Sequence, residues 1–211
     1  PSPKTRAIAA EAIGALLKRV SGDVFHSLLE YQCRWMGERE QNEGLARAAA
    51  QGVGLFVDTR PDLFKRGGEE GLGMELLVLL SETLASVEKR GPISGVDAAD
   101  LEEPRERQGE AALGWEMAYH CLGSLGRVYA KLPSMMEGFL HNTSEGMILL
   151  SATSEILCYR HAWVRLAASR LMGHYLDRRA AGGSGKTATT AATLASSPFL
   201  SEPANAGALA R

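Results

Sequence analysis

Residues 161–179, HAWVRLAASRLMGHYLDRR, decide the fold class of this chain of 211 residues. Apolar side chains recur in this stretch at intervals of three and four residues, which gathers them on one face of an α-helix. The stretch therefore predicts an amphipathic helix over 162–179. The residues expected to face inward are Val164, Ala167, Ala168, Leu171, Met172 and Tyr175.

The same periodicity continues upstream in six further segments, each bounded by turn or capping residues. The inward positions are Ile8, Ala12, Ile13, Leu16, Leu17 and Val20; Val24, Phe25, Leu28, Leu29, Cys33 and Met36; Leu45, Ala49, Val53, Phe56 and Val57; Leu76, Leu77, Leu80, Leu84 and Val87; Leu113, Ala118, Leu122, Leu125 and Tyr129; and residues 147–157. A shorter helix is expected around Met135 and Leu140, after Pro133. Asp23, Asn42 and residues 142–144 are the expected N-caps, because short polar side chains accept hydrogen bonds from free amides at helix starts.

No segment shows the sustained alternation of apolar and polar residues that marks a half-buried strand. We therefore predict an all-α fold, an α-solenoid of antiparallel HEAT-like helix pairs with a disordered C-terminal tail. The expected organisation is helix pairs over 1–90, an acidic connector over 91–109, further helix pairs over 110–179, and a disordered low-complexity tail over 180–211. The tail holds too few large apolar residues to offset the entropy of ordering it.

Composition excludes several classes of protein. The formal net charge of −2 argues against a uniformly basic nucleic-acid-binding protein. No apolar run approaches the roughly 18 residues that cross a bilayer, so no membrane partner is expected. Pro1–Thr5 carries neither an initiator Met nor the apolar core of a signal peptide, which favours a piece of a longer protein.

The cysteines and histidines do not form a recognisable reactive site. Cys33, Cys121 and Cys158 are an odd number and lie far apart, so we interpret them as small core residues in a reducing compartment. Cys158 and His161 have the spacing of half a metal site, but there is no second pair. We expect no metal, no cofactor, no small-molecule substrate and no enzymatic activity.

Ala180–Thr187 matches a relaxed phosphate-loop pattern that ends in Gly185-Lys186-Thr187. Such a loop needs a buried strand before it and a helix after it, so that backbone amides surround a phosphate. Here a helix enters and an Ala/Thr-rich stretch follows. We interpret the match as a coincidence of composition, and nucleotide binding abolished by Lys186→Ala would contradict that interpretation.

Basic residues gather at the C-terminal end of the helical region. Six basic residues stand against the single acid Asp177, and the candidate RNA-contacting residues are Arg160, Arg165, Arg170, Arg178 and Arg179. Guanidinium groups bind phosphates without regard to base identity. The alternative is an ordinary solvated helix face.

Trp115 and Trp163 lie in helical segments with apolar neighbours, and we predict that both are packing anchors. For Trp163 the alternative is a platform on which an RNA base stacks. The two possibilities differ in the effect of Trp163→Ala, which would destabilise a core anchor by about 3–5 kcal/mol.

Two stretches resemble a known family. Residues 35–58, WMGEREQNEGLARAAAQGVGLFVD, and residues 159–176, YRHAWVRLAASRLMGHYL, are similar to the C-terminal region of the DRIM (down-regulated in metastasis) family. Its members are very large HEAT-repeat proteins of the small-subunit processome, associated with U-three small nucleolar RNA. The matching core is His161, Trp163, Val164, Leu166, Ala167 and Ala168; a Pro that often lies between two His in the family is absent here.

The resemblance implies a non-enzymatic scaffold segment in the nucleolus that supports small-subunit processome assembly and pre-18S rRNA processing. Its implied partners are assembly-factor proteins of the pre-ribosome, together with pre-ribosomal RNA through a weak basic face. The alternative is a HEAT-repeat adaptor or transport module that binds protein partners.

Overall fold

The computed structural model describes residues 3–87, 111–159 and 161–183, and within these ranges it contains helices and no strand. The elements are α1 (Pro3–Leu17), α2 (Gly22–Gly37), α3 (Glu43–Thr59), α4 (Pro61–Phe64), the 3-10 helix η1 (Gly68–Glu70), α5 (Leu72–Ser86), α6 (Ala111–Lys131), α7 (Pro133–Asn142), α8 (Ser144–Ile156) and α9 (Ala162–Gly183). The predicted connector 91–109 lies outside the described residues.

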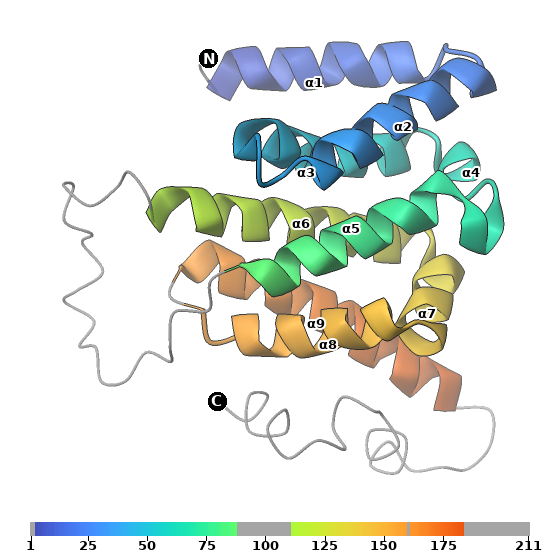
Figure 1. Ribbon diagram of the computed structural model, residues 1–211. Coiled ribbons are helices and arrows are strands. Elements are labelled where there is room, and N and C mark those ends of the chain that lie inside the picture. Colours follow the sequence, from blue (N-terminus) through green and yellow to red (C-terminus); the bar gives the residue numbers. More distant parts are fainter. Residues whose placement is uncertain (1–2, 88–110, 160, 184–211) are drawn as a thin grey trace.

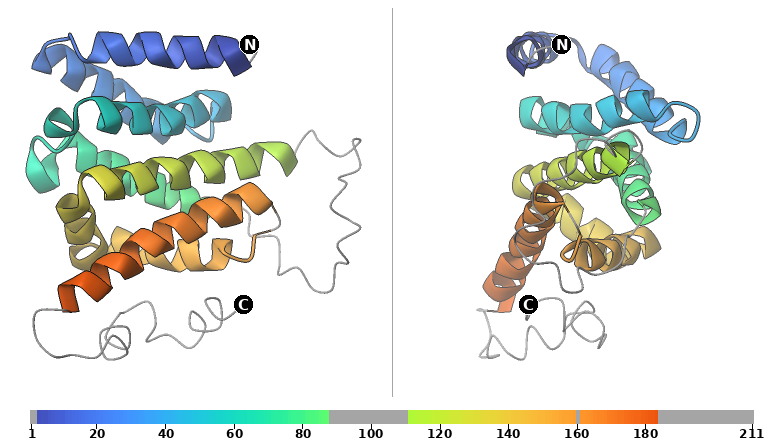
Figure 2. Two further views of the ribbon diagram at one scale, coloured as in Figure 1. Left: turned by 180° about the vertical axis from the view of Figure 1, so that it is seen from behind. Right: turned by 90° about the vertical axis from the view of Figure 1, so that its left-hand side faces the viewer.

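The helices form two stacked layers (Figures 1 and 2). One layer contains α1, α3, α6 and α9, and the other contains α2, α5 and α8. The long helices of one layer run opposite to those of the other, as Figure 1 shows, because short turns join successive elements. The prediction of an all-α solenoid is confirmed.

Polar side chains cap the N-termini of three helices by accepting hydrogen bonds from backbone amides. Asn42 Oδ1 accepts from the Leu45 amide at 3.1 Å, and Thr143 Oγ1 accepts from the Gly146 amide at 3.0 Å. Both belong to the predicted caps. The prediction for Asp23 was wrong: Ser21 caps α2 through a 3.3 Å bond from the Val24 amide, and Asp23 lies in the first turn. A carboxylate in that position still faces the positive end of the helix dipole.

A continuous apolar core lies between the two layers. The inward residues predicted for the last helix are all buried, and so are most of those predicted for α3 and α5. Phe25 and Phe56 join α2 to α3 through an edge-to-face contact, with ring centroids 5.2 Å apart. Ser124 Oγ donates to the Ala50 carbonyl at 2.6 Å, which ties α6 to α3.

The first helix departs from its predicted packing. Leu17 is buried, but Ile8, Ile13 and Leu16 are exposed, the last by 64%. Among the long helices, α1 packs on α3 at one end of the stack, and no described residue covers its other side. Periodicity predicted the helix correctly, but most of its apolar face is not part of the core.

The turn into α5 and the turn into α8 use the same close contact. In the first turn, the short helix α4 begins at Pro61 and contains the fully buried Phe64; in the second, α7 begins at Pro133 and contains the fully buried Phe139. In both turns, the carbonyl of this phenylalanine lies against the start of the next helix. A Cβ added to Gly73 would lie 2.2 Å from the Phe64 oxygen, and one added to Gly146 would lie 2.2 Å from the Phe139 oxygen. The helices α3 to α5 and α6 to α8 are therefore two copies of one structural unit.

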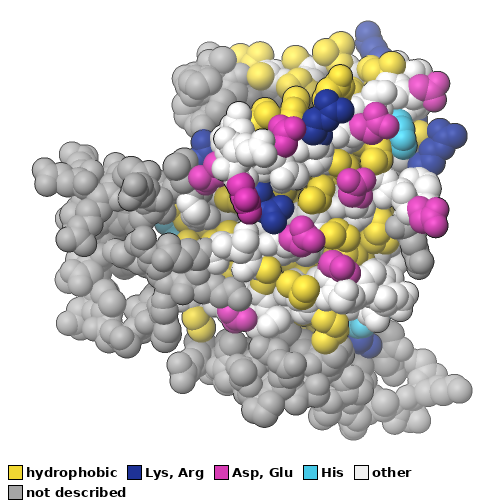
Figure 3. Space-filling model, in the orientation of Figure 1, with side chains coloured by type: hydrophobic (Ala, Val, Ile, Leu, Met, Phe, Trp, Pro, Cys, Tyr) yellow, Lys and Arg dark blue, Asp and Glu magenta, His cyan; other side chains and the backbone are white. Residues whose placement is uncertain are grey.

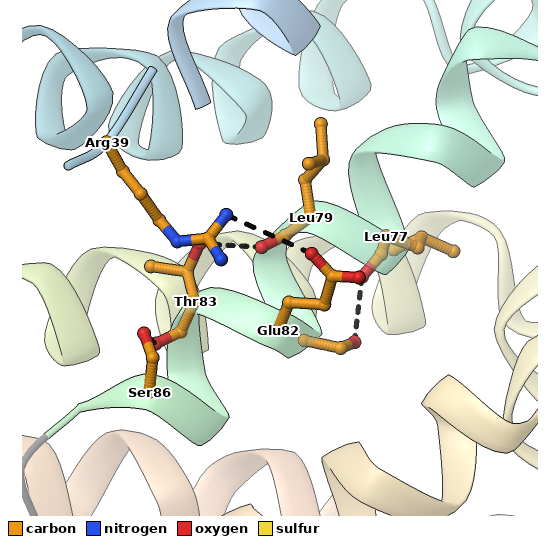
Figure 4. Close-up of polar contacts among 7 residues, drawn as sticks. Arg39, Leu77, Leu79, Glu82, Thr83 and Ser86 are labelled. Carbon is orange, nitrogen blue, oxygen red and sulfur yellow. Dashed lines mark hydrogen bonds and ion pairs between the residues drawn. The ribbon is translucent and has the colours of Figure 1, made fainter. Parts of the chain in front are cut away.

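Polar groups on α5 are satisfied within the helix or across the layer. Ser81 and Thr83 donate to the carbonyls of Leu77 and Leu79 one turn earlier, at 2.7 and 2.6 Å (Figure 4). The carboxylate of Glu82 lies 3.9 Å from the guanidinium of Arg39, which follows α2 (Figure 4). Such bonding lets hydroxyl side chains occupy a buried helix at little energetic penalty.

The last helix extends to Gly183, past the predicted boundary at 180. Alanine and glycine at 180–183 follow an established helix, which can continue for a turn because adding a residue to a formed helix is far easier than starting one. Residues 184–211, which include Gly185-Lys186-Thr187 and most of the predicted disordered tail, lie outside the described residues.

Candidate interaction surface

The five arginines predicted to contact RNA do not form one face. Arg160 lies outside the described residues. Arg165 donates to the Tyr159 carbonyl at 2.8 Å, which closes the turn before α9. Arg179 lies 2.8 Å from His141 Nε2 and places its guanidinium 5.6 Å from the centre of the Tyr175 ring. Arg165 and Arg179 thus contact neighbouring parts of the protein.

Arg170 and Arg178 are exposed on α9. Eight residues separate them, which corresponds to a rotation of about 80° around the helix axis. Arg170 lines a groove on the layer of α3, α6 and α9, and Arg178 does not. Of the four arginines that the structure describes, Arg170 alone lines this groove, and contact of these residues with RNA stays a prediction.

This groove has a volume of about 740 Å³ and extends over α1, α3, α6 and α9. Its small residues leave the backbone of two neighbouring helices close to solvent; they are Ala48, Gly52, Gly123, Gly126 and Ala130. Its polar and aromatic lining residues are Gln51, Tyr119, His120, Ser124, Arg127, Arg170 and His174. Figure 2, seen from behind, shows this side of the stack.

Two ring contacts fix how α9 lies along α6. Tyr119 meets Trp163 edge-to-face at 6.2 Å, and ten residues further along α6 Tyr129 stacks on His174 at 6.1 Å. The two helices therefore run in the same direction, and Arg127 and Arg170 both lie in the interval between these contacts. Arg127 is not among the site residues predicted from the sequence. The one signal in the sequence is that Arg127 lies seven residues after His120, a spacing that places both residues on the same face of a helix.

The prediction that Trp163 is a core anchor was wrong. The Trp163 side chain is 62% exposed, and Leu166, three residues further along α9, is 49% exposed. Val164 and Ala168 face the core. Trp163 precedes Val164, so it is rotated from Val164 by about 100° around the helix axis, toward the side of the groove. Trp115, in contrast, packs against the core and stacks on His161 with ring centroids 3.8 Å apart, as expected of a packing residue.

Arg127 crosses from α6 to α3. Its guanidinium lies 3.3 Å from Asp58, and its side chain passes over Gly54, where a Cβ would meet it at 2.8 Å. Glycine at position 54 thus gives the arginine room to reach across the layer. A second pair, Arg47 with Glu116, joins the same two helices nearer their starts.

The two layers carry opposite charge, which the net charge of the chain conceals. The helices α2, α5 and α8 contain six acidic residues and one basic residue. The helices α3, α6 and α9 contain four acidic and seven basic residues. Figure 3 views the acidic layer, over which Asp and Glu side chains are spread. The groove opens on the basic layer.

The cysteines behave as buried thiols at two positions. Burial raises the pKa of Cys33 and of Cys121 to about 12, and at Cys33 the nearby Glu75 adds to the rise. Cys158 is half-buried. Among the described residues no group of three or more His, Cys, Asp or Glu side chains is placed to hold a metal ion.

Within the described ranges, no helix is both long enough and apolar enough to cross a bilayer.

The described residues form an all-α solenoid, and the lining of its groove contains two arginines and no acidic residue. The chain is 26% identical over 174 residues, 82% of its length, to U3 small nucleolar RNA-associated protein 20 of Schizosaccharomyces pombe. It spans about 6% of the length of that relative. No family model matches the chain, and no solved structure matches it.

Proposed function

We propose that this chain is a segment of a non-enzymatic scaffold that serves ribosome biogenesis, through assembly of the small-subunit processome and processing of pre-18S rRNA. The observation that carries the proposal is the similarity to a protein named for its association with U3 small nucleolar RNA. The similarity extends over 174 residues, so it concerns a stretch as long as most of the helical stack and not one short motif.

The proposed partners are assembly-factor proteins of the pre-ribosome, and the proposed location is the nucleolus. Two extended layers with opposite charge offer separate surfaces to basic and to acidic partners. The groove, lined in part by glycine and alanine, also offers a binding surface.

Affinity purification of the tagged full-length protein tests the proposal. We expect U3 RNA and pre-18S rRNA to co-purify well above an unrelated nuclear RNA, and depletion to delay 18S rRNA without affecting the large-subunit RNA. Recovery of transport receptors or vesicle coats without these RNAs would establish the alternative, a helical-repeat adaptor.

A matched pair of variants shows whether the helical stack is needed. Leu80 is fully buried in α5, so Leu80→Arg places a charge in the core and should abolish co-purification of the RNAs. Val24 is exposed on α2, and Val24→Arg should leave co-purification unchanged. Equal recovery with both variants would contradict a role for this segment.

A further inference from the structure

We propose that single-stranded RNA binds in the groove on α3, α6 and α9, with a base stacked on Trp163 and phosphates bound by Arg170 and Arg127. The choice of RNA among anionic partners rests on the proposed function. The position and composition of the site rest on the structure alone.

Trp163 is not part of the groove lining, but it lies one turn before the lining residue Ala167 and against the lining residue Tyr119, and there it can act as a stacking platform. Tyr119 supports it from the side through the edge-to-face contact at 6.2 Å, and most of the indole remains exposed. An aromatic ring that is held by a neighbour yet open to solvent can stack on any base, since every base has a π-face.

Arg170 lies on the same face of α9 as Trp163. Seven residues separate them, which is close to two full turns and about 10 Å along the helix axis. Among the described residues, Arg170 has no ion-pair partner, so its guanidinium is available to a phosphate. A base on Trp163 and a phosphate on Arg170 are then one to two extended nucleotides apart.

Arg127 supplies a second cation from the other side of the groove. The two ring contacts between α6 and α9 bracket both arginines, so they face a common stretch of the groove. The pair with Asp58 is exposed and joins residues of two helices, and exposed pairs are weak enough for a phosphate to compete with the carboxylate. Glycine and alanine make up part of the groove lining, and their small side chains leave room for a nucleic-acid backbone.

An acidic amphipathic peptide is the competing occupant, because the groove also has apolar lining residues such as Leu55 and Ile13. The observations favour RNA, since the aromatic ring and the two guanidinium groups supply both types of contact that single-stranded nucleic acids require. The basic excess of this layer adds long-range attraction for a polyanion.

Fluorescence anisotropy of the 211-residue protein with a labelled oligouridylate of about twelve nucleotides tests the site, because single-strand sites cover about 4–16 nucleotides. We expect Trp163→Ala to weaken binding by about five- to 150-fold, and Trp163→Phe to retain most of the affinity. Tyr31→Ala is the matched control, since Tyr31 is an exposed aromatic on the opposite layer, and it should bind as the unchanged protein does.

Charge variants test the phosphate contacts over salt concentrations of about 50–200 mM. Arg127→Gln combined with Arg170→Gln should reduce the slope of log affinity against log salt by about 1.4, the value for two phosphate contacts with a single strand. Arg178→Gln removes an exposed arginine outside the groove and should leave the slope unchanged. Asp58→Asn releases Arg127 and should strengthen binding about two- to fivefold.

Several results would overturn the proposal. They are equal binding of duplex and single-stranded RNA, unchanged affinity in Trp163→Ala, and binding of a glutamate-rich helical peptide in place of RNA. Unaltered melting of Trp163→Ala confirms that any loss of binding is not a loss of folding. Failure of the oligonucleotide to bind would contradict the groove site but not the proposed function, which the co-purification of U3 RNA tests. Absence of U3 RNA from the purified protein would contradict the proposed function, regardless of whether the oligonucleotide binds.

Discussion

Substitution of Gly146 by alanine is the sharpest test of how the structural unit is held together. The added Cβ would lie 2.2 Å from the Phe139 carbonyl oxygen and 2.6 Å from the Leu140 Cα, where ordinary contact begins at 3.4 Å. Backbone of α7 or α8 must therefore move by about 1 Å, because no flexible side chain is available to yield.

The oxygen that must move already holds the turn in place. The Phe139 carbonyl accepts from the Thr143 amide at 3.3 Å and from the Thr143 hydroxyl at 2.7 Å, and that hydroxyl in turn accepts from the Gly146 amide. Overpacking costs about 1–3 kcal/mol and a weakened N-cap about 1 kcal/mol, against a helix-propensity gain of about 1 kcal/mol for alanine. We expect Gly146→Ala to lower the free energy of unfolding by about 1–3 kcal/mol.

Gly173→Ala is the matched control. It makes the same chemical change in the middle of α9, where nothing lies within 4 Å of the added Cβ. It should raise stability by about 0.5–1 kcal/mol. Urea denaturation followed by far-ultraviolet circular dichroism measures both, and each kcal/mol should move the melting temperature by about 2–4 °C. Shifts of the same sign and size in the two variants would refute the reasoning, and Gly73→Ala should behave as Gly146→Ala does.

Three further predictions concern the core. Ser124→Ala removes the hydroxyl that bonds to Ala50 and should destabilise the protein by about 0.5–1.5 kcal/mol in the same urea assay; no change would mean that the bond contributes nothing. At about pH 8 a thiol reagent should label Cys158 quickly and Cys33 and Cys121 only on unfolding, since both buried thiols have a pKa raised to about 12; rapid labelling of all three would contradict their burial. These two thiols keep their protons in the folded state, whereas the unfolded chain loses them near pH 9. The free energy of unfolding should therefore be unaffected by them below about pH 9 and decrease between about pH 9 and pH 12. The decrease should reach up to about 1.4 kcal/mol per pH unit for each thiol. A profile that stays flat over this range would contradict the raised pKa values.

Much of the fold could be predicted from the sequence, because periodicity defines which residues share a helix face. The inward set of α9, from Val164 to Tyr175, is buried as expected, and Asn42 and Thr143 cap the helices that follow them. Periodicity does not say whether a neighbouring helix is present to cover that face. For this reason Leu16 was assigned to a core and lies in solvent.

The groove could not be predicted, because it depends on how separate helices are aligned. The arginines near the C-terminus form a cluster in sequence, but α9 distributes them around its axis and turns Arg165 and Arg179 toward internal partners. Arg127 joins Arg170 only because α6 runs beside α9 in the same direction. Trp163 lies next to an inward residue, and a single position along a helix is enough to turn a side chain from the core to the surface.

Within the part of the chain that the structure describes, opposite charge on the two layers gives the helical stack an electric dipole that runs from one layer to the other. A large polyanion that approaches by diffusion experiences a torque before it touches the surface, and it is turned toward α3, α6 and α9 in preference to the acidic layer. Attraction of this kind raises the association rate more than it lowers the dissociation rate, and it weakens as ions shorten the range of the field to about 8 Å at physiological ionic strength. Which face an incoming strand meets first is then decided by the distribution of charge between the layers, although the chain as a whole is slightly negative.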